Sequence, residues 1–401
     1  MKVVAAALKN LSSSGVRLER LPPLSLYVHI PWCVRKCPYC DFNSHEARDD
    51  LPEAAYVAAL VRDLEQALPA IWGRRIVSVF IGGGTPSLFS AQGIDSLLSA
   101  LRARLAVGPE CEITLEANPG TFEAEKFREF RSAGVNRLSV GVQSFNARHL
   151  KALGRIHDDA EAKRAVGMAL DRFENVNLDL MYGLPGQTLA EAESDLRSAL
   201  SFGAPHVSYY HLTIEPNTLF HRHRPSVPDD DAAAAMQEMI EGRLADAGYA
   251  HYETSAYAIP DRECRHNLNY WRFGDYLGIG AGAHSKLSFP DRIVRQVRTR
   301  HPAEYLKRAA NAVPLQQEQE VATADVAFEF MMNALRLTEG FPAALFTERT
   351  GLPIAAAAGP LDQAEERGLI TRTDGHIRPT EFGRRFLNDL LQIFLNGEPK
   401  E

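Results

Sequence analysis

The sequence predicts an α/β protein, a partial (β/α)6 barrel followed by a smaller α+β module of the winged-helix type. Two observations support this. From residue 26 to about residue 228, short apolar runs alternate with longer amphipathic stretches, which is typical of βα units around a parallel sheet. From residue 318 onward, helical stretches lead into a short hairpin pattern at Gly368–Pro379. Because eight units close a full barrel, six units predict a barrel that stays partly open.

The predicted strands are short apolar runs. They are Leu26–Ile30, Ile76–Ile81, Glu112–Glu116, Arg137–Val142, Val176–Met181 and Val207–Leu212. The helices between them repeat apolar residues at a period near 3.6. They are Pro52–Leu68, Ala91–Leu105, Ala124–Ala133, Asp159–Arg172 and Leu189–Phe202. In such a barrel the loops that follow the strands carry the functional residues.

A turn-rich segment from residue 215 to 231 separates the barrel from a helix at Ala232–Ala247 and a strand near Tyr249–Thr254. The glycine-rich segment Gly278–His284 follows. We therefore expect four parts: an N-terminal arm (1–25), the barrel (26–228), a barrel extension (229–317) and a C-terminal winged-helix-like domain (318–401).

The C-terminal part combines helices at Ala324–Leu337 and Leu361–Arg367 with the hairpin and a final helix from Glu381. Winged-helix modules often bind nucleic acid, and that function predicts a basic face. Residues 361–395 instead contain five arginines and six acidic residues. We therefore expect a packing or docking domain and no nucleic-acid partner.

The composition is that of an ordinary globular protein, with 45% hydrophobic and 24% charged residues and a net charge of −7 over 401 residues. The apolar stretch Val3–Leu8 is shorter than a signal-peptide core, and no run is long enough to predict a transmembrane segment. Five cysteines, three of them crowded together, do not suggest a disulfide framework. We expect a cytoplasmic protein with metal or redox chemistry.

The three crowded cysteines, Cys33, Cys37 and Cys40, follow the first predicted strand with C-x3-C-x2-C spacing. Three thiolates can hold three irons of a 4Fe–4S cluster and leave the fourth iron open for a small chelating molecule. Zinc is the alternative, because His29 or His45 could supply a fourth ligand.

The stretch from Tyr27 through Cys40, with Tyr39 directly before the third cysteine, resembles the cluster loop of the radical S-adenosylmethionine (SAM) superfamily. Within it, the stretch is similar to the oxygen-independent coproporphyrinogen III oxidase group. The resemblance implies that the open iron binds the amino and carboxylate groups of SAM. It also implies that an electron from the reduced cluster, supplied by a donor such as a flavodoxin or ferredoxin, cleaves SAM to a 5′-deoxyadenosyl radical.

The next motif, Gly82-Gly-Gly-Thr-Pro86, follows the second predicted strand. Because glycine has no Cβ, such a run lets backbone groups approach a ligand, although a tight turn would also use it. It resembles the glycine motif with which the superfamily hydrogen-bonds the SAM amino group.

Four polar residues, Glu116, Gln143, Arg155 and Asp179, fall at or near the ends of predicted strands. A charged group in an apolar strand needs a partner or a ligand, so ion pairs of Arg155 with Asp179 or Glu116 are the alternative to ligand binding. By resemblance, the residues that line the SAM pocket or a second SAM site are Tyr27, Gly83, Gly84, Thr85, Glu116, Gln143, Arg155 and Asp179.

Two features separate the branches of this group. The oxidases carry a fourth cysteine two residues after the third, where this sequence has Phe42, which cannot replace a thiol. The motif His266-Asn-Leu-Asn-Tyr270-Trp271 resembles that of the HemW-type haem chaperones. We expect His266 to be an axial ligand of haem iron, with Tyr270 and Trp271 supplying flat apolar surface.

The resemblance therefore implies a haem chaperone that binds a 4Fe–4S cluster, SAM and haem and delivers haem to an acceptor apoprotein. The alternative is an oxygen-independent coproporphyrinogen III oxidase. Cys111 is expected in the core, Cys264 as a buried free thiol, and His284 in a pocket without an assigned role.

Overall fold

The computed structural model describes residues 15–47, 50–121 and 124–395. The predicted stretch Val3–Leu8, most of the N-terminal arm and the last residues of the C-terminal part lie outside these ranges. None of the helices in the described part of the chain is long and apolar enough to cross a membrane.

Six parallel strands form the centre of a large sheet, in the order β1-β4-β5-β6-β7-β8. Their bounds are Leu24–Ile30 (β1), Arg75–Gly83 (β4), Ala106–Ala117 (β5), Arg137–Gln143 (β6), Val176–Tyr182 (β7) and His206–His211 (β8). All six predicted strands are present. The sheet does not close on itself, which confirms the partial barrel.

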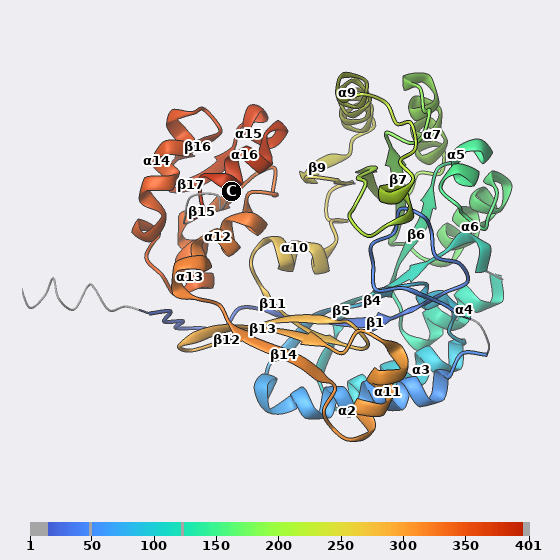
Figure 1. Cartoon of the computed structure of the whole chain (residues 1–401), viewed down its shortest axis with the longest axis horizontal. Coiled ribbons are helices and arrows are strands. Elements are labelled where there is room, and N and C mark those ends of the chain that lie inside the picture. The colour runs from blue at the N-terminus through green and yellow to red at the C-terminus, as the bar shows by residue number, and fades with distance from the viewer. Residues whose placement is uncertain (1–14, 48–49, 122–123, 396–401) are drawn as a thin grey trace, which may run out of the picture.

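Helices on the outer face connect these strands (Figure 1). They are α2 (Glu53–Ile71), α3 (Ala91–Arg102), α4 (Ala124–Ala133), α5 (Ala147–Ala152), α6 (Asp159–Arg172) and α7 (Leu189–Ser201). Their apolar sides and the strands share one hydrophobic core that includes Leu60, Leu98 and Val166. The short helix α5 was not predicted, because six residues are too few to show a helical period.

The sheet continues beyond both edges of the six strands, giving twelve strands in all. On one side lie β10 (Ala256–Ala258) and β9 (Ala250–Glu253), reached through α8 (Leu219–Arg222) and α9 (Asp230–Asp246). On the other side lie β11 (Asp275–Ile279), β12 (His284–Phe289), β13 (Arg292–Arg298) and β14 (Leu315–Glu320). Strand β11 pairs with β1 in parallel, and the glycine-rich segment forms the turn between β11 and β12. Helix α11 (Pro302–Ala310) packs against α2.

The C-terminal part combines helices with a three-stranded sheet and has its own hydrophobic core. Its elements are α12 (Thr323–Ala334), β15 (Phe341–Pro342), α13 (Ala343–Thr350), α14 (Ala358–Glu366), β16 (Ile370–Thr373), β17 (His376–Pro379), α15 (Glu381–Arg385) and α16 (Leu387–Gln392). The predicted hairpin is β16–β17, and the predicted final helix is divided at Phe386. The N-terminal Val16 and Leu18 belong to this core.

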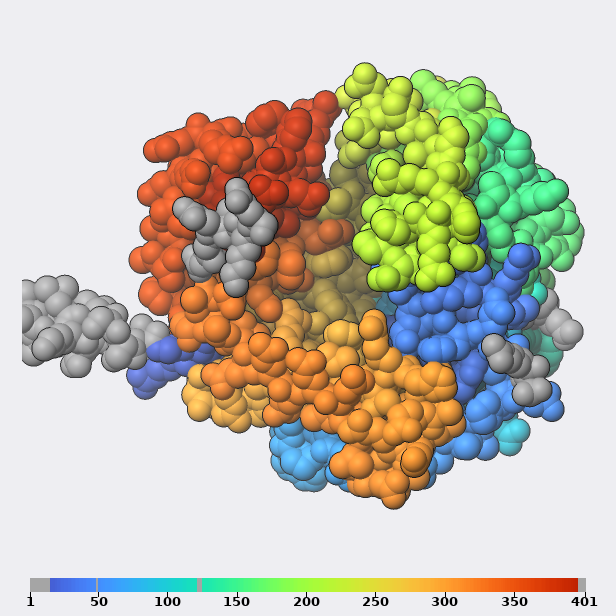
Figure 2. Space-filling model, viewed as in Figure 1, coloured from blue at the N-terminus to red at the C-terminus, as the bar shows by residue number. Residues whose placement is uncertain are grey.

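The barrel and the C-terminal part appear as two bodies with a recess between them in the space-filling view (Figure 2). Strand β9 and helix α10 (Arg265–Trp271) lie between them in the ribbon view (Figure 1). Arg336 links the two bodies, because it pairs with Glu253 at 3.3 Å and lies over the Trp271 ring at 4.3 Å.

Candidate functional site

A cavity of about 390 Å³ opens at the carboxyl ends of the barrel strands, and we call it the cysteine pocket. Ten of the residues predicted from the sequence line it. They are Cys33, Cys37, Cys40, Gly83, Gly84, Thr85, Glu116, Gln143, Arg155 and Asp179. Parallel strands bring their carboxyl ends to one rim, so residues more than 140 positions apart meet here.

The three thiols are free, half-buried and held by a loop that is fixed at both ends. The loop starts at β2 (Trp32–Cys33) and closes at β3 (His45–Glu46), which pair in parallel. Arg155 Nη1 donates to Cys37 Sγ at 3.6 Å, and Cys40 Sγ lies 3.7 Å from Ser44 Oγ. Burial raises the pKa of Cys33 and Cys40, which favours the protonated thiol over the thiolate at these two residues.

The histidines that a zinc site would need are not available. His29 is buried, its Nδ1 lies 2.9 Å from the Tyr27 hydroxyl, and its Nε2 lies 2.9 Å from the carbonyl oxygen of Asn43. His45 bonds Asn43 Oδ1 at 3.3 Å and faces the ring of His301. Neither histidine lines the cysteine pocket, and the three thiols that do line it fit a cluster with one open iron.

The fold requires the glycines at the end of β4, Gly83 and Gly84. Gly83 has φ +121°, and a Cβ there would lie 2.7 Å from the His29 ring. A Cβ at Gly84 would lie 2.5 Å from the carbonyl oxygen of Trp32. The tight-turn interpretation of the motif therefore applies, and the same close approach to the cysteine loop exposes this backbone to the pocket.

Glu116 and Asp179 line the pocket, and within the described residues neither forms an ion pair. Gly83 N donates to Glu116 Oε2 at 2.9 Å, and burial, with the nearby Asp179 adding to it, raises the pKa of Glu116 to about 8. Asp179 accepts from Ser139 Oγ and Asn177 Nδ2 at 2.8 Å each, and burial raises its pKa. Within the described residues Arg155 forms neither predicted ion pair, because its Nη2 donates to the carbonyl oxygen of Gly141 at 2.7 Å.

Gln143 lies at the end of β6 with φ +68°, a conformation that non-glycine residues rarely adopt. Such strain is retained where the surroundings fix it, often at ligand sites. Sequence reasoning missed Tyr210 and His211, which line the same pocket from the end of β8. Their position in the sequence could have identified them, because they end β8, the sixth barrel strand, and the barrel strands end at the same rim.

The motif from His266 to Trp271 forms most of helix α10 (Arg265–Trp271). His266 is 4% exposed, and it packs beside the rings of Phe80 and Tyr270. Its Nδ1 bonds Ser78 Oγ at 2.9 Å, and its backbone N–H donates to Glu112 Oε1. It lines neither of the two large cavities.

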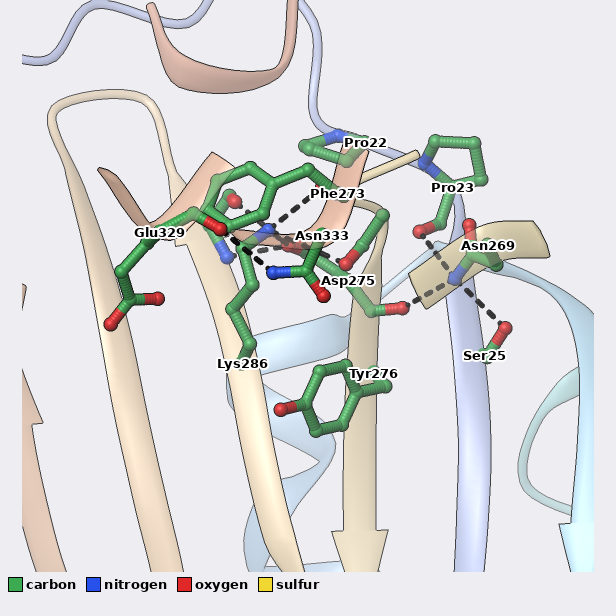
Figure 3. A network of polar contacts seen from close by, with 12 residues as sticks. Pro22, Pro23, Ser25, Asn269, Phe273, Asp275, Tyr276, Lys286, Glu329 and Asn333 are labelled. Atoms are coloured by element: carbon green, nitrogen blue, oxygen red, sulfur yellow. Dashed lines mark hydrogen bonds and ion pairs between the residues drawn. The ribbon is translucent and has the colours of Figure 1, made fainter. Parts of the chain in front are cut away.

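Asn269, in the same helix, completes this anchor. Its Nδ2 donates to Ser25 Oγ, to the carbonyl oxygen of Asp275 and to that of Pro23 (Figure 3). Ser25 Oγ in turn lies 2.7 Å from Ser78 Oγ. His266, Ser78, Ser25 and Asn269 therefore form a continuous chain of hydrogen bonds that fixes α10 against β1 and β4.

A buried charge cluster lies next to this anchor. Lys286 Nζ donates to Asp275 Oδ1 at 3.0 Å and to the carbonyl oxygen of Phe273 at 2.9 Å (Figure 3). Arg74 pairs with the other carboxylate oxygen at 2.8 Å. Every charge is paired, which a buried ionic group requires.

The remaining predicted residues separate into two environments. Tyr270 and Tyr27 line a second cavity of about 360 Å³, which we call the tyrosine cavity. Trp271 faces the C-terminal part under Arg336, and its buried Nε1 has no hydrogen-bond partner among the described residues. Cys111 and Cys264 are both buried, as expected.

Known protein families match the barrel and the C-terminal part separately. Residues 27–199 match the model of the Radical SAM superfamily, and residues 321–386 match the HemN C-terminal domain. The chain is 50% identical over 380 residues to "Heme chaperone HemW" of Escherichia coli (strain K12), covering 94% of this chain and 100% of that protein. The chain belongs to the HemW family. The match to the family member from Bacillus subtilis (strain 168) is 34% identical and covers 92% and 99% of the two chains.

A solved structure shows the same fold at lower identity. It is the coproporphyrinogen III oxidase HemN from Escherichia coli, with a TM-score of 0.80, 22% identity, and coverage of 93% of this chain and 90% of that chain. The HemW family thus shares the partial barrel and C-terminal part of HemN, and the predicted fold class is confirmed.

Proposed function

We propose that this protein is a cytoplasmic haem chaperone that carries a 4Fe–4S cluster and SAM and delivers haem to an acceptor apoprotein. The observation that supports this most directly is the convergence of three free thiols, the glycine turn and the carboxyl groups of Glu116 and Asp179 in one pocket. Relatives that are 50% and 34% identical over nearly their whole length bear the name haem chaperone.

The thiolates of Cys33, Cys37 and Cys40 would hold the cluster, and Arg155 would stabilise the thiolate form of Cys37 through its hydrogen bond. When bound, the cluster supplies an electron to SAM. The cluster receives that electron from a reduced protein donor such as a flavodoxin or ferredoxin. The Gly83–Thr85 backbone and the carboxylate of Glu116 would orient the cationic groups of SAM.

The alternative is radical decarboxylation of coproporphyrinogen III. Phe42 disfavours it, because this residue is 61% exposed and lines the cysteine pocket without offering a group that can carry a proton or an electron. Its apolar ring is instead suited to contact a flat apolar ligand.

The test uses the purified chain, reconstituted anaerobically with iron and sulfide. We expect a broad visible absorption band, of the kind that 4Fe–4S clusters give, and a separate, sharper Soret band on addition of one equivalent of haem. Serine at Cys33, Cys37 or Cys40 should remove the cluster band, whereas Cys111→Ala should keep it. Turnover of coproporphyrinogen III with SAM and reductant, or no Soret band, would contradict the proposal.

A further inference from the structure

The tyrosine cavity contains a histidine, His284, that is better placed than His266 to bind a ligand. His284 begins β12, lines the cavity and is exposed, and its ring has no hydrogen-bond partner among the described residues. His266 is buried and bonded to Ser78. A metal ligand must present a ring nitrogen to the bound group. His266 is buried and lines neither cavity, so only His284 of these two is placed to bind a ligand in the tyrosine cavity.

The walls of the cavity are aromatic. Tyr270 and Tyr276 stack with their ring centroids 4.1 Å apart and 25° between their planes, and Tyr27 and Phe42 also line the cavity. Four rings from the β1 strand, the cysteine loop, α10 and β11 therefore surround one space. Such surroundings fit a flat, largely apolar ligand.

The rim of the cavity carries a free positive charge. Arg300 lines the cavity, is exposed, and has no ion-pair partner within the described ranges. An exposed guanidinium at the edge of an aromatic cavity is suited to bind a carboxylate of the same ligand.

The cavity is held in shape by the cysteine loop. Asn43 Nδ2 donates to the carbonyl oxygens of Ala281 at 2.9 Å and of Arg300 at 2.8 Å. A Cβ at Gly282, where φ is +79°, would lie 2.3 Å from the same Nδ2. The turn that carries His284 is thus fixed to the loop that carries the three cysteines.

We propose that the tyrosine cavity is the haem site, with His284 as the axial ligand of the iron and Arg300 as the partner of a propionate. This inference rests on the proposed function, because it names where the haem of that function binds. Haem has the three features that the cavity matches: a flat apolar macrocycle, an iron that takes imidazole, and two carboxylates. His266 is then a positioning residue, which holds α10 so that Tyr270 faces the ligand.

The protonation of His284 agrees with this role. Partial burial lowers its pKa, and the positive charges of Arg300 and Arg295 add to the effect, which favours the neutral imidazole that iron requires. The two cavities also share Asp41, Phe42, Gly83 and Glu116. Haem and the cluster ligands would therefore lie in adjoining cavities, with Phe42 lining both of them.

The test is a haem titration of the reconstituted full chain, followed by its Soret band. We expect His284→Ala to weaken haem affinity about tenfold or more and to shift the band toward that of five-coordinate or free haem. His284→Met should instead keep binding and raise the reduction potential of the haem, because thioether replaces imidazole. His301→Ala is the matched control, since this neighbouring exposed histidine does not line the cavity.

A second pair of variants tests the proposed contact between Arg300 and a haem propionate. Arg300→Glu should weaken haem affinity, whereas Arg224→Glu, an exposed arginine away from both cavities, should leave it unchanged. A normal Soret band in His284→Ala together with its loss in a folded His266→Ala protein would overturn the site and leave the proposed function standing. Absence of a Soret band from the unaltered protein would overturn both.

Discussion

Glu116 lies at the junction of the two cavities, because its side chain lines both of them. Its pKa is raised to about 8 by burial and by Asp179, whereas the ordinary value is 4.5. The folded state therefore binds a proton that the unfolded state releases between these two pH values. Stability should fall as pH rises from 4.5 through about 8.

Glu116→Gln should remove this pH-dependent loss of stability, because the neutral amide does not titrate. Thermal unfolding of the ligand-free protein, measured across this pH interval, should show a declining midpoint for the unaltered chain and a flatter one for the variant. Equal slopes for the two proteins would mean that Glu116 titrates normally.

Gly83 is the second residue whose environment can be tested. Gly83→Ala would place a Cβ against the His29 ring at a φ of +121°, and we expect a loss of about 1–3 kcal/mol of stability and weaker SAM binding. Gly167→Ala is the control, because this glycine of α6 has no atom within 4 Å of the added Cβ and should be neutral or slightly stabilising. Equal melting temperatures for the two variants would contradict the strain argument.

At this scale the sequence predicted the cysteine pocket well and the environment of His266 poorly. Ten pocket residues could be found because most of them follow or lie near the end of a strand, and parallel strands end at one rim. Asp179 lies in the middle of β7 and Arg155 follows α5. The motif at 266–271 contains ligand-type residues, but their spacing does not tell which side faces the protein. His266 and Asn269 point toward Ser78 and Ser25, which no pattern within the motif indicates.

At the scale of elements, helix α10 is anchored by the hydrogen-bond chain through Ser25 and Ser78. Ser78→Ala leaves the buried Nδ1 of His266 without its partner and should cost about 1–3 kcal/mol of stability. Ser198→Ala, on the exposed side of α7, is the control and should change little. Urea unfolding measures both, and an unchanged midpoint for Ser78→Ala would show that the chain of bonds is dispensable.

The six barrel strands could be predicted because each contains a largely buried, mostly apolar run, and amphipathic helices connect most of them. Strands β11 to β14 could not be predicted from the sequence. Strand β11 is short and leads into the glycine turn, and β14 is a largely exposed polar strand of sequence LQQEQE. Their place is decided by pairing with β1 and with one another, which is a long-range property.

At the scale of the whole molecule, Arg336 connects the barrel with the C-terminal part through Glu253 and the Trp271 ring. Arg336→Ala should loosen this junction, and amide hydrogen exchange in α12 should become faster. Arg372→Ala breaks ion pairs that lie wholly within the C-terminal part, so it should leave exchange in α12 as it was. Equal exchange in both variants would mean that other contacts hold the junction.

The C-terminal part could be recognised as a separate module because its pattern changes from strands to helices and a hairpin. The division at residue 318 stays a prediction, and β14 continues across that position. That Val16 and Leu18 join its core could not be predicted, because two apolar residues near the start of a chain carry no periodicity.

This shared core also has a consequence for the order in which the molecule is completed during synthesis. Arg17 N donates to the carbonyl oxygen of Gly351, so the first described residues are held by a segment that the ribosome makes more than 300 residues later. Until that segment emerges, Val16 and Leu18 have no core to enter and remain exposed to water. The barrel can form its strands earlier, but its N-terminal arm must wait for the last module to fold.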